Sequence, residues 1–247
     1  FPRGAAISTT APRDWAAVAA AAAVAKPLVW PTSHPNHLCF GALDGSVRMG
    51  ALKTNKTETL FARPNLPVTA LAASPDGRAI LAGHLDGALV AYSFADAMFK
   101  TLVTHPCPPY VLAWGVDVMA VGPGGSVYFY DCRNGDVVTK GTTTPSGTSG
   151  EATCGAFSPN GDTALIAGSD FLASYSRRAR DRQWEASSVK EVPHLHAAPG
   201  PTLAWRPDGS GLVVGTLTGG VDAFESMLKR AMYRGHDLAG KPRELLI

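Results

Sequence analysis

A repeated unit of about 45 residues occupies most of the chain and restricts the fold more than any other feature. Five segments align on a glycine that follows a small or apolar residue, and these glycines lie 39 to 47 residues apart. The aligned glycines are Gly41, Gly83, Gly122, Gly168 and Gly215. A period of this size indicates supersecondary units that bury their apolar faces against neighbouring copies.

The unit "LAASPDGRAILAGHLDGALVAYSF" shows what one copy can form. It contains an apolar strand, a Pro-Asp-Gly turn, a second apolar strand, a Leu-Asp-Gly turn and a third strand. The Asp-Gly pairs supply the positive φ that tight hairpins require. Residues 79–82 are all apolar, which is typical of a strand covered on both faces. Since one sheet cannot cover both of its own faces, we expect the sheets to pack around a common axis.

The period and the hairpin pattern therefore predict an all-β fold, a WD40-type β-propeller. Five blades are expected within residues 30–225, and two more before Phe1 would complete a seven-bladed ring. Residues 1–29 are expected to form a partial blade or an alanine-rich insertion, and residues 226–247 an exit segment toward a following domain. A helical repeat lacks support because amphipathic helical stretches are almost missing, and a β-sandwich does not explain five phased copies.

The Trp-Asp pair from which WD40 repeats take their name is incomplete in this chain. An aromatic–acidic pair persists at Tyr130-Asp131 and Phe224-Glu225, whereas two other copies have lost the acid. We therefore expect an incomplete network of histidine and aspartate hydrogen bonds, with His84 in a structural role. Four copies also carry an aromatic residue upstream of the aligned glycine, at Trp30, Trp114, Phe157 and Trp205.

A histidine, a cysteine and three prolines lie together before the third copy. The residues of this "HPCPPY" stretch are His105, Pro106, Cys107, Pro108, Pro109 and Tyr110. Proline restricts its own φ and the conformation of the residue before it. We therefore interpret the stretch as a stiff structural connector between blades. Trp114, which follows it in the chain, is expected to pack between sheets.

Two chemical alternatives apply to the same stretch. His105 and Cys107 supply two metal ligands, whereas a structural zinc site takes four. His194 and His196 form a second close pair that could meet the first. A thiol nucleophile at Cys107 would need a base and a third group that orients it. We prefer the connector, and expect no catalytic residue, no metal and no cofactor.

A run of arginines falls in the longest interval of the repeat. The members of this candidate partner-binding loop are Arg177, Arg178, Arg180 and Arg182. Arginine makes bidentate pairs with carboxylates, so contact with an acidic protein surface is one function for the loop, and a solvated hairpin is the other. The chain's net charge of +2 argues against nucleic acid as a partner, while contact with a membrane surface stays open.

The composition suits a cytosolic domain rich in turns. Gly (26) and Pro (19) are numerous, and the four cysteines contain no CxxC pair, so reduced thiols are expected. The alanine-rich stretch of residues 15–30 is shorter in its apolar part than the roughly 20 residues that a membrane span needs. No transmembrane helix is predicted.

Several stretches in order add a resemblance to a known family. They include "FGALDGSVR", "LAGHLDGALVAY", "THPCPPYVLAW", "RRARDRQWE" and "GTLTGGVDAFESMLKRAMY". Over about residues 27–233 the chain resembles the N-terminal WD40 propeller in the family of the largest intraflagellar transport complex B subunit. Members of this family carry two propellers followed by a helical solenoid.

The resemblance implies a non-catalytic interaction scaffold in the trains that support cilium and flagellum assembly. The implied partners are other complex B subunits, including one with a calponin-homology domain. The implied location is the cilium or flagellum and the basal body, in the cytoplasmic compartment. The alternatives are a WD40 scaffold of another trafficking or coat complex, and a metal-binding propeller that uses His105, Cys107, His194 and His196.

Overall fold

The computed structural model describes residues 27–143, 151–192, 195, 202–217, 219–225, 234–236 and 242–244. These residues form antiparallel sheets whose strands pair in chain order. The first sheet contains β1 (Leu28–Val29), β2 (His37–Gly41), β3 (Ser46–Ala51) and β4 (Lys56–Ala62). The second contains β5 (Val68–Ala73), β6 (Ala79–His84), β7 (Ala88–Ser93) and β8 (Met98–Thr104).

The remaining sheets follow the same plan. The third contains β9 (Val111–Trp114), β10 (Val118–Val121), β11 (Ser126–Tyr130) and β12 (Val137–Thr142), with a short 3-10 turn η1 (Pro123–Gly125) before β11. The fourth contains β13 (Ala152–Phe157), β14 (Thr163–Gly168), β15 (Phe171–Arg177) and β16 (Trp184–Glu191). The fifth contains β17 (Leu203–Trp205), β18 (Gly211–Gly215) and β19 (Val221–Glu225). A separate pair joins β20 (Arg234–His236) to β21 (Pro242–Glu244).

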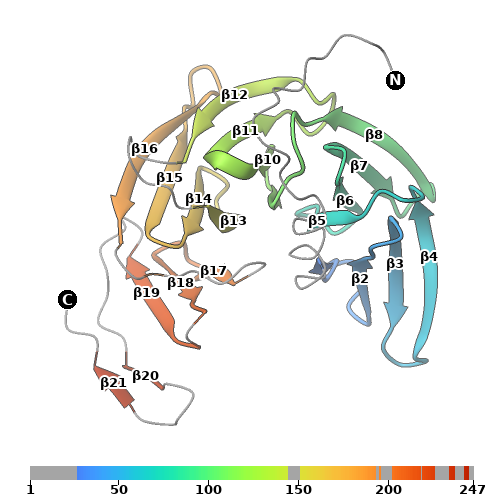
Figure 1. Cartoon of the computed structure of the whole chain (residues 1–247), viewed down its shortest axis with the longest axis horizontal. Helices are drawn as coiled ribbons and strands as arrows, with labels where there is room; N and C mark the ends of the chain where they lie inside the picture. The colour runs from blue at the N-terminus through green and yellow to red at the C-terminus, as the bar shows by residue number, and fades with distance from the viewer. Residues whose placement is uncertain are drawn as a thin grey trace.

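The five sheets follow one another around an arc (Figure 1). Strands β5, β13 and β17 lie toward the inside of the arc, whereas β4, β8, β12 and β16 run along its outside. The described strands of the first and fifth sheets lie at opposite ends of the arc (Figure 1). The prediction of an all-β propeller is confirmed, and the count of seven blades in a closed ring stays a prediction.

The hydrophobic core lies between the sheets. In β10, Val118 and Ala120 pack against the second sheet, while Met119 and Val121 pack against the fourth. All four side chains are fully buried. This is the physical reason for the continuous apolar runs in the sequence, because each inner strand has a neighbour on both faces. Trp114 packs at the boundary of the second and third sheets, as predicted.

The aligned glycines do not all occupy one structural position. Gly122 donates its N–H to the Ser126 carbonyl, as Ala42 does to the Ser46 carbonyl in the first sheet. Gly122 is therefore the counterpart of Ala42, one residue beyond Gly41. Gly168 is displaced in the same way, since it pairs with the start of β13 as His84 pairs with the start of β5. The sequence alignment was wrong by one residue in these two copies.

The two kinds of glycine position, represented by Gly83 and Gly122, face the neighbouring sheets on opposite sides. A Cβ added at Gly83 would lie 2.4 Å from Cγ of Pro109, which leads into the next sheet. A Cβ added at Gly122 would lie 2.2 Å from Sγ of Cys107, in the connector from the preceding sheet. Both sites need glycine for a close approach, but one residue of displacement reverses the face of a strand. The sequence pattern alone does not distinguish them.

The fourth strand that the first four sheets contain was not recognised from the sequence. Most residues of β4, β8 and β16 are exposed, because these strands lie on the rim with one neighbour in their sheet. Such strands lack the apolar run that marks the inner ones. In the part of the chain that the structure describes, no helix has the length and apolar character to cross a membrane. Residues 1–26, and most of the predicted exit segment 226–247, lie outside the described residues.

Candidate functional site

The "HPCPPY" connector joins the outer strand β8 to the inner strand β9. His105 donates its backbone N–H to the Gly87 carbonyl at 2.8 Å. The exits of the first and third sheets make the same bond, from Arg63 to Gly45 and from Thr143 to Gly125. The connector therefore begins at a turn that the fold repeats from sheet to sheet.

The His105 side chain is buried, with 1% of its surface exposed. Its Nδ1 lies 2.7 Å from the Tyr130 hydroxyl, and its ring meets Tyr128 edge-on with 4.8 Å between centroids. Its Nε2 has no hydrogen-bond partner within the part of the chain that the structure describes. Burial lowers the pKa of His105 to about 4, so the imidazole is neutral at neutral pH. His105 thus packs as a neutral ring between sheets.

The remaining connector residues are buried or half-buried, except Pro106, which is exposed. Pro108 and Pro109 are buried, and Tyr110 donates its backbone N–H to the Val121 carbonyl. Burial raises the pKa of the Cys107 thiol, which opposes the thiolate that a nucleophile or metal ligand requires. Among the described residues, no three His, Cys, Asp or Glu side chains gather as a metal site would need.

His194 and His196 lie outside the described residues, so the alternative of a metal site shared with the connector is not tested. The predicted structural histidine, His84, is buried and its Nδ1 lies 2.9 Å from the Leu66 carbonyl. Among the described residues, the His84 Nε2 has no hydrogen-bond partner.

The arginine hairpin connects β15 to β16, and its stem is fixed to the third sheet. Arg177 Nε lies 3.2 Å from Oδ2 of Asp117, in the turn between β9 and β10. The indole N–H of Trp184 donates to the same oxygen at 3.0 Å. Trp184 is buried and stacks on Phe129 with 4.6 Å between ring centroids. Asp117 is itself 4% exposed, so one buried carboxylate holds both strands of the hairpin.

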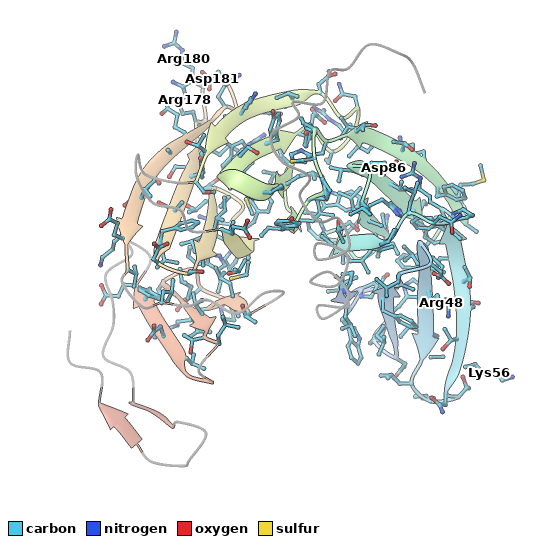
Figure 2. All side chains as sticks on the ribbon, viewed as in Figure 1. Arg48, Lys56, Asp86, Arg178, Arg180 and Asp181 are labelled. Carbon is cyan, nitrogen blue, oxygen red and sulfur yellow. The ribbon has the colours of Figure 1, made fainter. Side chains whose placement is uncertain are left out.

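Arg178 holds the loop internally. Its guanidinium lies 3.2 Å from Asp181 and 2.9 Å from Glu185. Figure 2 shows Arg178, Arg180 and Asp181 projecting beyond the outer edge of the arc. Arg180 and Arg182 are exposed, and neither forms an ion pair with another described residue. Arg177 and Arg178 therefore have structural roles, whereas Arg180 and Arg182 lie exposed at the tip of the hairpin.

Sequence reasoning missed two acidic residues that join sheets. Asp117 interrupts the apolar stretch "WGVDVMAV", and an acid in such a run was a signal that it could be buried with a partner. Asp86 lies in a Leu-Asp-Gly turn and accepts a bidentate pair from Arg63, with both nitrogen–oxygen distances at 2.8 Å. This pair links the exit of the first sheet to the second sheet.

Comparison with known proteins identifies relatives of this region. The chain is 37% identical over 214 residues to Intraflagellar transport protein 172 of Chlamydomonas reinhardtii, a match that covers 84% of this chain and 12% of that protein. The human homologue is 34% identical over 212 residues with the same coverage, and the osm-1 protein of Caenorhabditis elegans is 27% identical over 207 residues. The chain thus spans about an eighth of the length of these relatives. No protein-family model matches.

The structural comparison concerns the fold alone. A chain in the crystal structure of the mitotic checkpoint complex superposes with a TM-score of 0.67 and 18% sequence identity. The match covers 83% of this chain and 61% of that one. The sequence matches confirm the predicted family resemblance, since the chain is homologous to a region of the intraflagellar transport protein 172.

Proposed function

We propose that this chain is a propeller scaffold of intraflagellar transport trains, which binds other train subunits and supports cilium and flagellum assembly. The observation that carries the proposal is the 37% identity to an intraflagellar transport protein over 84% of the chain. The arrangement of sheets is compatible with this role, because radial sheets leave the rim and both faces of the arc free for protein contacts. The chemistry is non-catalytic.

The proposed partners are the other complex B subunits, including one with a calponin-homology domain. The proposed location is the cilium or flagellum and the basal body. Within the chain, residues 105–110 serve as a structural connector, and the arginine hairpin contributes to a partner-binding surface. Support for the connector comes from the backbone bond of His105 and the close packing of Cys107 and Pro109.

Affinity purification of the tagged full-length protein from ciliated cells tests this proposal. We expect the other complex B subunits to co-purify, and the tag to localise to the ciliary base and along the cilium. Co-purification with vesicle-coat subunits in place of complex B subunits would show that the scaffold serves another trafficking assembly.

A further inference from the structure

The arginine hairpin divides its four guanidinium groups between two tasks. Arg177 is bound to the buried carboxylate of Asp117, and Arg178 is bound to Asp181 and Glu185. These contacts use both acidic side chains of the hairpin. Arg180 and Arg182 therefore leave positive charge at the tip that the hairpin itself does not neutralise.

The tip has a fixed backbone conformation. Arg178 donates its N–H to the Gln183 carbonyl at 2.8 Å, and Arg182 donates to the Arg178 carbonyl at 2.9 Å. The Asp181 carboxylate also accepts the Gln183 N–H. Arg182 has a φ of 61°, in the left-handed region that a residue with a side chain seldom adopts. Because these bonds hold the turn, a partner meets two arginines whose backbone is already ordered.

The neighbouring turn of the third sheet contains an arginine and an aspartate that already pair with each other. Arg133 lies there with its side chain 74% exposed, and it pairs with Asp131. The hydrogen bonds from Arg133 and the nearby charge of Arg182 lower the pKa of Asp131 to about 2. Asp131 therefore stays ionised and is already bound, so it adds no free negative charge that would repel an acidic partner.

We propose that Arg180 and Arg182 bind an acidic segment of a protein partner, whereas Arg177 and Arg178 position the hairpin. Guanidinium groups pair with carboxylates in a bidentate geometry, which fits an acidic peptide or loop. The chain's small net charge of +2 gives no general electrostatic attraction to nucleic acid. This inference rests on the proposed scaffold role and specifies the chemistry of one contact.

The test measures binding of a fluorescent glutamate-rich peptide to the full-length protein. The key variant is Arg180→Glu with Arg182→Glu, and the charge-matched control is Arg78→Glu with Arg206→Glu, two exposed arginines in turns of the second and fifth sheets. We expect the double variant to bind the peptide about tenfold more weakly, with the control unchanged. Added salt should weaken binding to the unmodified protein. Unchanged thermal melting would show that the double variant is folded.

Three outcomes would overturn the inference: equal peptide affinity in the double variant and the control, no peptide binding by the unmodified protein, or binding only to a single-stranded oligonucleotide or to phosphatidylserine vesicles. Each outcome leaves the scaffold proposal standing if complex B subunits still co-purify with the full-length protein. Loss of that co-purification in the unmodified protein would instead contradict the scaffold role itself.

Discussion

The indole N–H of Trp184 donates to Oδ2 of Asp117 at 3.0 Å, across the boundary between the fourth and third sheets. The same oxygen lies 3.2 Å from Nε of Arg177. A buried carboxylate with a charged and a neutral donor links two blades at one point. This link adds to the apolar contacts between these two sheets and to the bond that the Tyr175 hydroxyl donates to the Thr142 carbonyl.

Replacement of Asp117 by Ala should destabilise the fold by about 3 kcal/mol, because it leaves the Arg177 charge and the Trp184 donor without an acceptor in a buried site. Urea unfolding measures the effect. The control is Asp96→Ala, which removes an exposed carboxylate that accepts a bond from Ser93, and it should change stability by less than about 0.5 kcal/mol. Equal losses in the two variants would mean that Asp117 does not link the sheets.

Gly83→Ala should also destabilise the protein, by about 1–3 kcal/mol, because the new Cβ would meet the rigid ring of Pro109 at 2.4 Å. Gly50 offers a matched control in β3, since a Cβ there would lie no closer than 3.7 Å to its neighbours. Gly50→Ala is therefore expected to leave the melting temperature nearly unchanged. If both variants melt alike, the close approach of the connector to β6 does not constrain residue 83.

Stability should fall as the pH drops from about 6.5 toward 4, because the unfolded chain then binds a proton that folded His105 does not. The lowered pKa of about 4 makes this contribution on the order of 3 kcal/mol. Burial lowers the pKa of His84 as well, so His105→Gln should reduce the pH dependence without removing it. Urea unfolding at pH 7 and at pH 5 measures how much the free energy of unfolding changes with pH in each protein. If this change is the same in the variant and in the unmodified protein, the claim that folded His105 stays neutral is wrong.

A double-mutant cycle on Arg63 and Asp86 should give a coupling of about 0.5–1 kcal/mol, since this bidentate pair is only partly exposed and joins two sheets. Arg78 and Asp76 provide the comparison pair. Their charged atoms are 4.0 Å apart and both side chains are largely exposed, so their coupling should be near zero. Equal coupling in the two cycles would show that the Arg63–Asp86 link adds nothing beyond surface electrostatics.

Much of the architecture could be predicted from local sequence. Asp-Gly turns were expected at residues 76–77 and 86–87, and Gly77 and Gly87 have φ values of 69° and 86°. The continuous apolar run of residues 79–82 predicted a strand covered on both faces, as β6 is. These features depend on residues close together in the chain, so a short segment of sequence is enough to predict them.

The contacts of the candidate site could not be predicted in this way. Asp117 and Arg177 are 60 residues apart, and nothing near either one in sequence indicates that they meet. The arginine run was evident, but its division into positioning and exposed residues depends on acids contributed by another sheet and by the hairpin's own fold. The face that each repeat glycine presents likewise depends on strand register.

The sequence alone determined that the chain folds into phased antiparallel sheets and that these sheets must shelter one another, because turn chemistry and apolar periodicity are local properties. Only the tertiary structure decided which polar groups form hydrogen bonds or ion pairs between sheets and which stay exposed. The reason is that the angle and register at which two sheets pack bring together distant residues, and the free energy of each charge depends on the partner that it meets there.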